Sequence, residues 1–341
     1  MYFTRIIYTY SIAFVFGLVF KSMNLPLPWI LGPVFGMLMM KLLFHIKTTS
    51  FAPLKNIGFS ILGIGIGFMF TSKTFEHVVP YILPYTVLTM ILIFISLYAA
   101  YTIAEKTALD KPTSLIGSAP GGLSVMIATS ESMNGNTVLV TIFHAIRLLA
   151  VLSIIPYTVI HFFNGQENIP LRSVSESGEG PWWSLFIYVI LYMIALMLHK
   201  RIPAAMVLLP MIAVGCLRTV SLPLFELPEV LFILAQLIIG VHLGNCINIS
   251  DIKKAGKYAW IYSGLSVMMI MISFLFGGLL HIWTGMDVAT AILSLAPGGL
   301  IEMALTAKEA GADAPLVSSL QMVRLFLIVL VLPGLFKRIT E

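Results

Sequence analysis

The sequence Ala119-Pro120-Gly121-Gly122-Leu123 interrupts a long apolar segment, and the same five residues recur as Ala296-Pro297-Gly298-Gly299-Leu300. Proline lacks the backbone N–H that a helix needs, and each glycine lowers helix stability by about 1 kcal/mol. In hydrocarbon, the backbone groups that such a break frees must find partners in the protein or in a watery cavity. The motif therefore predicts an interrupted helix in each half of the chain. The alternative is that these residues only kink two helices or let them pack closely.

The composition predicts a membrane protein. Of the 341 residues, 59% are hydrophobic and 10% are charged, and the mean hydropathy is +0.98. These values exclude an ordinary water-soluble domain and a disordered chain. One crossing takes about 20 apolar residues, so the chain is expected to be an all-α polytopic protein in a lipid bilayer. The net charge of +5 comes from Lys and Arg between apolar runs, which is typical of topology signals and not of a nucleic-acid partner.

The two halves of the sequence match at an offset of 177 residues. Residues 107–156 and 284–333 share 15 identities in 50 positions, and Arg147 matches Arg324. Because proline, glycine and arginine are among the matches, shared apolar character cannot explain them, and an internal duplication is indicated. The predicted organisation is a first membrane repeat, a polar extracytoplasmic linker and a second membrane repeat, at 1–163, 164–181 and 182–341.

The positive charges predict how the halves cross the bilayer. If all six apolar segments of each half cross, the Lys and Arg outside the arginine-bearing segments divide ten against eight. If the Ala-Pro-Gly-Gly segment re-enters, each half makes five crossings, and the division becomes thirteen against five. The second arrangement agrees with the excess of positive charge in cytoplasmic loops. It predicts two inverted repeats of about five crossings each, with both termini in the cytoplasm. A crossing but broken helix, with another segment reassigned, would also invert the halves.

The two motifs form the first part of a candidate substrate site. Interrupted helices at corresponding positions of two repeats mark the central site of many transporters. The half-helix after each glycine pair presents unpaired N–H groups and a positive dipole end, which favour an anion. The motif residues assigned to this site are Pro120, Gly121, Gly122, Pro297, Gly298 and Gly299.

Arg147 and Arg324 form the second part of this site. Placing an arginine in a membrane helix costs about 2.5–3.5 kcal/mol on insertion scales, so each must face a partner or a cavity. They could line a route for an anion, or they could pair with carbonyl groups that the breaks expose, and these roles are compatible. His144 and Gln321 lie one turn before the two arginines on the same helix face. They could orient a solute or connect helices by polar contacts.

Glu302 lies three residues after Gly299, whereas Val125 occupies the matching position of the first half. The carboxylate could bind a coupling proton or sodium ion, or it could cap the first helical turn. The glycines at 63, 65, 67, 240 and 244 have the spacing of closely packed helices. The seven histidines and two cysteines show no ligand spacing, so the sequence predicts no metal, no cofactor and no catalytic residue.

The paired Ala-Pro-Gly-Gly-Leu-x-x-Met motifs, the Gly-x-x-x-Gly pairs and the arginine before each final proline resemble the AbrB duplication family of bacterial inner-membrane proteins. The resemblance implies a multi-pass protein of the bacterial cytoplasmic membrane. Members carry labels such as ammonia monooxygenase or AbrB family transcriptional regulator. The second motif of the family includes a glutamate, which Glu302 matches, whereas Val125 departs from a two-carboxylate pattern. The architecture is also similar to that of sodium–proton antiporters and bile-acid transporters, by analogy of fold alone.

The sequence favours a secondary transporter or exporter of a small anionic or zwitterionic solute, with a proton or sodium ion as the coupling ion. A homo-oligomer is compatible with this reading. A membrane regulator of gene expression is the alternative. A membrane monooxygenase is less favoured, because copper or iron would need converging histidines and carboxylates.

Overall fold

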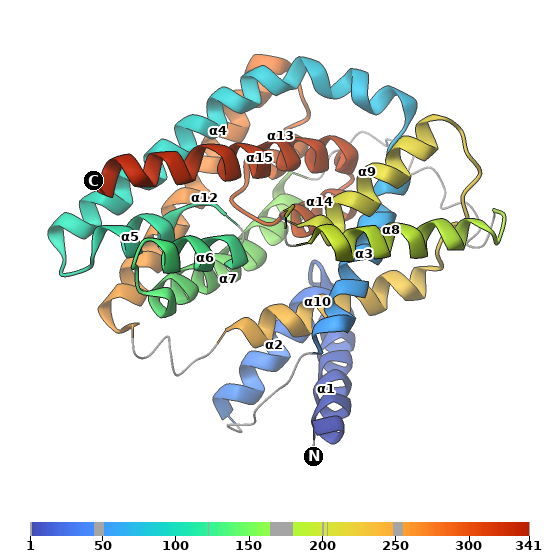
Figure 1. Ribbon diagram of the computed structural model, residues 1–341, viewed down its shortest axis with the longest axis horizontal. Coiled ribbons are helices and arrows are strands. Elements are labelled where there is room, and N and C mark those ends of the chain that lie inside the picture. The colour runs from blue at the N-terminus through green and yellow to red at the C-terminus, as the bar shows by residue number, and fades with distance from the viewer. Residues whose placement is uncertain are drawn as a thin grey trace. The chain divides into compact units, whose positions relative to one another are not determined.

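The computed structural model describes residues 2–43, 51–121, 123–163, 180–199, 201–202, 204–247 and 255–340. Within these ranges every regular element is a helix, which confirms the all-helical expectation (Figure 1). Gly122 and all but the last two residues of the expected linker at 164–181 lie outside the described residues.

The helices of the first half are α1 (Tyr2–Ser22), α2 (Pro28–Leu43), α3 (Ala52–Phe68), α4 (Ser72–Lys106), α5 (Lys111–Ser118), α6 (Leu123–Ser132) and α7 (Thr137–Phe162). Those of the second half are α8 (Ser184–Leu198), α9 (Ala205–Thr219), α10 (Glu229–Cys246), α12 (Lys257–Thr284), α13 (Val288–Leu295), α14 (Leu300–Glu309) and α15 (Ala314–Thr340). The bounds of α13 and α14 lie 177 residues after those of α5 and α6.

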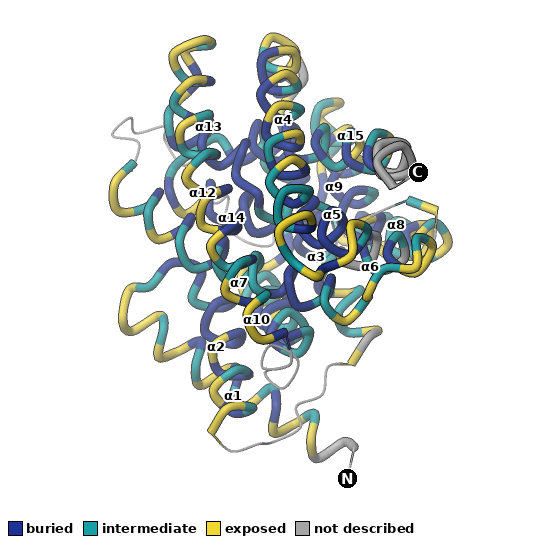
Figure 2. Tube along the Cα trace, turned by 90° about the vertical axis from the view of Figure 1, so that its left-hand side faces the viewer, coloured by how far each residue is buried: buried dark blue, intermediate teal, exposed yellow. Residues whose placement is uncertain are grey.

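Six of the described helices are long and apolar enough to cross a membrane, and four shorter ones are also apolar. On α12, Trp260 and Trp283 are 82% and 58% exposed. A helix rises 1.5 Å per residue, so these rings lie about 35 Å apart along the axis, close to the thickness of a bilayer core. Tryptophan is favoured at both membrane surfaces. Figure 2 shows exposed and buried residues alternating along α4 and α12, as expected where one side contacts lipid.

The described chain forms two compact units, and each draws segments from both halves of the sequence. Unit 1 comprises residues 1–77, 164–247 and 304–315, and unit 2 comprises residues 78–163, 248–303 and 316–341. In unit 1, α2 packs against α1 and α10, whereas α9 packs against α8 and α3 (Figure 1). Helix α3 also contacts α10. At the offset of 177 residues, the α1–α2 contact corresponds to the α8–α9 contact, and the α2–α10 contact corresponds to the α9–α3 contact.

The glycine pairs bring the helices of unit 1 together. A Cβ on Gly63 would lie 2.5 Å from the backbone oxygen of Val207, and one on Gly240 would lie 2.6 Å from that of Ile30. Val207 and Ile30 are themselves matched positions. Only glycine therefore lets the backbones of α3 and α9, and of α2 and α10, approach so closely. The prediction of close helix packing at these glycines is confirmed.

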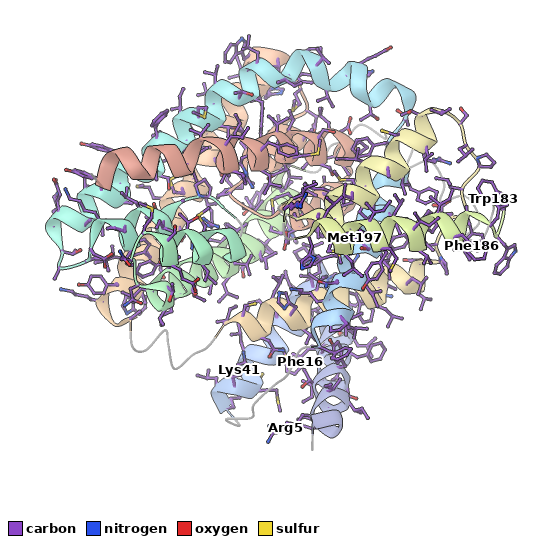
Figure 3. The ribbon with its side chains drawn as sticks, viewed as in Figure 1. Arg5, Phe16, Lys41, Trp183, Phe186 and Met197 are labelled. Carbon is purple, nitrogen blue, oxygen red and sulfur yellow. The ribbon has the colours of Figure 1, made fainter. Side chains whose placement is uncertain are left out.

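Lys41 caps the end of α10. Its ammonium group donates to the carbonyl oxygens of Gly244, Asn245 and Ile247 at 2.9, 3.1 and 2.8 Å. A cation at this position also complements the negative end of the helix dipole. Figure 3 shows Lys41 on α2, Trp183 directly before α8, and Phe186 and Met197 on α8. Trp183, Phe186 and Met197 are 49%, 73% and 81% exposed.

In unit 2, α7 contacts α5, α6, α12 and α13. The Tyr85 hydroxyl of α4 donates to Ser294 O of α13, and the Tyr262 hydroxyl of α12 donates to Ser114 O of α5. Tyr85 and Tyr262 are matched residues, so each half of the sequence bonds to a short helix of the other. The Phe143 and Tyr262 rings stack with centroids 3.5 Å apart, which joins α7 to α12.

Candidate functional site

The two short helices that lead into the breaks begin in the same way. The Asp110 side chain accepts a hydrogen bond from Thr113 N at 2.9 Å, and Asp287 accepts one from Thr290 N at 2.9 Å. Each aspartate thereby satisfies one of the N–H groups that an α-helix leaves unpaired at its start. The caps fix where α5 and α13 begin, and with them the depth at which the chain reaches each break.

Both short helices end because a proline follows. Steric contact with a proline ring pushes the preceding residue out of the helical region. Ala119 accordingly has φ −59° and ψ 133°, and Ala296 has φ −56° and ψ 135°. The chain resumes a helix at Leu123 in α6 and at Leu300 in α14. The interruption expected at each Ala-Pro-Gly-Gly sequence is therefore present in the described residues.

An arginine from a neighbouring helix holds each break. Arg147 Nη1 donates to Ala119 O at 2.6 Å, and its Nη2 donates to Gly121 O at 3.0 Å. Arg324 makes the matching pair of hydrogen bonds to the carbonyls of Ala296 and Gly298. The carbonyl groups freed by the breaks thus find the partners that a buried backbone requires. Pairing to these carbonyls was one of the two predicted roles of the arginines.

The same two arginines line one cavity in unit 2. About 20 Å³ is open to the centre of a water-sized sphere, which is room for one or two water molecules. The lining residues come from the short helices, the breaks and the long helices around them. They are Thr89, Leu92, Ile93, Ser96, Ser118, Pro120, Arg147, Met269, Leu295, Pro297 and Arg324. The structure therefore brings together both prolines and both arginines of the predicted site.

The charge around the cavity is positive. Arg324 is buried and Arg147 is partly buried, and none of the described lining residues carries a carboxylate. The C-terminal ends of α5 and α13 supply about half a negative charge each, which offsets only part of two guanidinium charges. The Thr89 hydroxyl is buried and lies beside the Tyr85 hydroxyl. An anion is the ligand that this arrangement favours.

The other predicted site residues lie beside the cavity, not in its lining. His144 and Gln321 are 3% and 2% exposed. Gln321 donates to Leu293 O just before the second break, whereas His144 Nδ1 bonds to Val140 O of its own helix. Glu302 is 7% exposed, and a Cβ on Gly299 would collide with its carboxylate. That carboxylate therefore covers the first turn of α14, which is the capping position that the sequence left open beside ion coupling. Gly122, also assigned to the site, lies outside the described residues.

Sequence reasoning missed the hydroxyl groups of the cavity. Thr89 and Ser96 of α4 line it, and both lie in an apolar helix without a recognisable motif. The internal repeat could have indicated these residues, because Thr89 matches Ser266 and Ser96 matches Ser273 in the second half. Small hydroxyl residues conserved between two halves of one chain indicate a shared requirement for polarity at those positions.

No metal site can be assigned in the part of the chain that the structure describes. There, no three His, Cys, Asp or Glu side chains come together as ligands would. On α10, two potential ligand atoms, Cys246 Sγ and His242 Nε2, lie 3.8 Å apart.

The fold and the cavity define an all-helical protein of membrane type with an arginine-lined site at paired helix breaks. The chain belongs to the AbrB family: the family model described as "Transition state regulatory protein AbrB" matches residues 29–340. It is 26% identical over 297 residues to "Uncharacterized protein YhjN" of Bacillus subtilis strain 168, covering 82% of this chain and 77% of that protein. It is 25% identical over 254 residues to "Putative regulator AbrB" of Escherichia coli strain K12, covering 72% and 71%.

Proposed function

We propose that the protein is a secondary transporter or exporter of a small anionic or zwitterionic solute, which passes through the cavity between the two helix breaks of unit 2. The observation that carries the proposal is the pair of matched arginines, Arg147 and Arg324, lining one cavity with no carboxylate among its described lining residues. Burying two cations at one place costs free energy unless a ligand of opposite charge binds there. A structural clasp alone would need each arginine near its own break, but not both at one cavity.

The arrangement of helices supports transport. The six long apolar helices and four shorter ones number five in each half, apart from the interrupted segments. This count supports two inverted repeats of about five crossings each, with an interrupted or re-entrant segment in each half. The proposal places both termini in the cytoplasm of a bacterial cell, as the positive charges predict. Inverted repeats with broken helices suit alternating access, because exchanging the conformations of the two halves exchanges the open side.

The size of the cavity bears on the transport cycle. Space for one or two water molecules accommodates a small inorganic anion or the carboxylate of a larger solute, but not a whole organic molecule. We therefore assign the described conformation to a state in which the cavity is too narrow for a whole organic solute. The larger solute classes require the lining helices to separate.

Coupling to a proton or sodium ion is part of the proposal. Glu302 lies at the start of α14, where its carboxylate competes with any anion for the positive end of that helix. Binding of a cation to Glu302 would remove this competition, so the residue stays a candidate for ion coupling.

The direct test is solute flux in proteoliposomes made from the purified full chain. We expect gradient-driven uptake of at least one small anion or zwitterion from a broad panel, above the rate in protein-free liposomes. We expect Arg324→Lys to lower that flux at least tenfold, because lysine has one donor nitrogen in place of a planar fork, so its contacts to the solute compete with those to the two carbonyls. Flux of no solute in the panel would overturn the proposal.

The second candidate function is a membrane regulator of gene expression, which the name of the Escherichia coli relative favours. A regulator without transport would act through a cytoplasmic partner. Stoichiometric co-purification of such a partner, together with absence of flux, would support this second candidate.

A further inference from the structure

One difference between the two breaks is the matched pair of buried residues His144 and Gln321. Gln321 Nε2 donates to Leu293 O at 2.8 Å and to Ser294 O at 3.0 Å. It also lies 3.3 Å from the carbonyl of Ala296, the one that Arg324 holds. The amide group of glutamine donates these hydrogen bonds at every pH. The hydrogen bonds from Gln321 to the second break therefore do not depend on pH.

The first break has His144 at the corresponding position. His144 Nδ1 lies 3.0 Å from Val140 O, the carbonyl one turn earlier on α7, so Nδ1 is assigned as the donor. Its Nε2 is buried and makes no hydrogen bond of normal geometry with the described residues. The ring lies beside the Ala119 carbonyl, the one that Arg147 holds. A buried unsatisfied polar atom costs about 1–3 kcal/mol. Where glutamine supplies donors, this ring presents a bare lone pair that can accept a proton.

The charged and titratable groups of the helices around His144 include Tyr85 of α4, which packs in one cluster with Phe143, bonds to Ser294 O and faces Arg324. Arg147 lies one turn further along α7 on the same face, and Arg324 lines the same cavity as Arg147. From α12, Tyr262 stacks on Phe143, the neighbour of His144, and its hydroxyl is bonded to α5. Helix α13 carries no titratable side chain. Lys111 of α5 and Glu131 of α6 lie at the ends of their helices and are exposed.

This charge distribution links protonation to the ligand. A proton on Nε2 adds a third positive charge beside two guanidinium groups, which is unfavourable while the cavity holds only water. An anion in the cavity offsets that charge. By reciprocity, the proton then raises the affinity for the anion by the same factor as the anion raises the affinity for the proton.

We propose that His144 is the proton-binding site that couples to occupancy of the anion cavity, so that one proton from solvent binds Nε2 as one anion enters. The proposal rests on the proposed function, since it names the coupling residue of that site. The step is balanced in charge: one negative and one positive charge enter together. Anion binding is strongest at low pH and weakens as pH rises and the proton leaves.

The test measures anion binding and proton uptake by the purified full chain in detergent. The probes are chloride, nitrate and formate, exchanged against gluconate at constant ionic strength, between about pH 5.5 and about pH 8, where histidine titrates. We expect the wild-type affinity to fall with rising pH, by up to about tenfold per pH unit. A pH-indicator dye in weak buffer should report proton uptake when the anion is added.

The chain offers a matched control for the variants. His161 is exposed on the same helix, and its Nδ1 makes the same contact to the carbonyl four residues earlier, at 2.9 Å from Tyr157 O. We expect His144→Gln, which copies the residue found at position 321, to bind the anion with the same affinity at both pH limits. We expect His161→Gln to keep the wild-type pH slope, and Gln321→His to steepen it.

The outcomes separate the two proposals. If none of the probes binds in a manner that Arg324→Lys weakens, the proposed function fails. If an anion binds but His144→Gln keeps the wild-type pH slope, the coupling role of His144 is overturned, and loss of that slope in Glu302→Gln would assign the role to Glu302. The coupling role of His144 would also be overturned if the wild-type protein took up no proton when it binds the anion.

Discussion

At the residue scale, Arg147 and Arg324 combine two roles that the sequence left as alternatives. Each guanidinium group donates to two carbonyls of a break and also lines the cavity. Arginine suits both roles because its planar group carries five donors in a fixed geometry, and only two are needed for the break. Each guanidinium group therefore has more donors than the hold on the break uses.

Replacing Arg147 by lysine tests this geometry. Lysine is shorter and carries one donor nitrogen, whereas arginine holds the carbonyls of Ala119 and Gly121 with two separate nitrogens. We therefore expect at least one of these two hydrogen bonds to be lost. We expect Arg147→Lys to lower stability by about 1–3 kcal/mol, measured as a lower thermal unfolding temperature in detergent. The control Arg201→Lys makes the same change at an exposed residue and should stay within about 0.5 kcal/mol of wild type. Equal stability of the two variants would show that the clasp is unimportant.

How much of the site the sequence predicts depends on the kind of residue. Arg147, Arg324, Pro120 and Pro297 could be found because proline and arginine are conspicuous in apolar segments and recur at one offset. Thr89 could not, because a single hydroxyl in an apolar helix often bonds only to its own backbone. The position of the Glu302 carboxylate depends on side-chain rotation, which spacing alone does not determine.

At the element scale, glycine spacing determines which helices pack. The matched contacts of Gly63 with Val207 and of Gly240 with Ile30 join helices from opposite halves. The sequence predicts close packing from this spacing, but it does not name the partner, because any helix with small or flat residues would fit. The partner emerges only from the folded chain.

Substituting one of these glycines tests the packing. We expect Gly63→Ala to destabilise the protein by about 1–3 kcal/mol, because the new methyl group would lie 2.5 Å from Val207 O and the backbones must separate. Gly264→Ala is the matched control on α12, where a Cβ meets nothing within 4 Å. It should be neutral or stabilising by up to about 1 kcal/mol. Thermal unfolding in detergent compares the two, and the idea fails if Gly63→Ala is as stable as Gly264→Ala.

The short helices show what local sequence predicts well and badly at this scale. The end of α5 and of α13 follows from the proline after each, and was expected. The aspartate caps at Asp110 and Asp287 were not recognised, although they recur at the same offset and precede each short helix by one residue. Helix α4 begins at Ser72 despite Pro80 and Pro84, where proline rules favour a later start.

At the scale of the whole molecule, the repeat and the compact units divide the chain differently. The repeat divides it at the linker, whereas each compact unit combines segments of both halves. The physical reason in unit 1 is that α2 packs against α10 and α3 packs against α9, so helices of both halves share one core. A repeat in sequence therefore predicts related elements, but it does not predict which of them share a core.

The inversion of the halves is best tested at one matched pair. Glu131 and Lys308 are exposed and occupy the same position of the two repeats. For single cysteines at these positions, in a chain without Cys216 and Cys246, we expect an impermeant thiol reagent to label position 308 in intact cells. Position 131 should be labelled only after the membrane is opened. Labelling of both positions from the same side would mean that the halves are parallel.

The central claim is that the cavity between the two arginine-held breaks binds an anion. The most direct measurement is an experimental structure of the protein in bromide, with anomalous scattering used to locate the ion. The account predicts a bromide peak in contact with the guanidinium groups of both Arg147 and Arg324. A cavity that holds only water at saturating bromide, or arginines neutralised by a protein carboxylate instead, would contradict it.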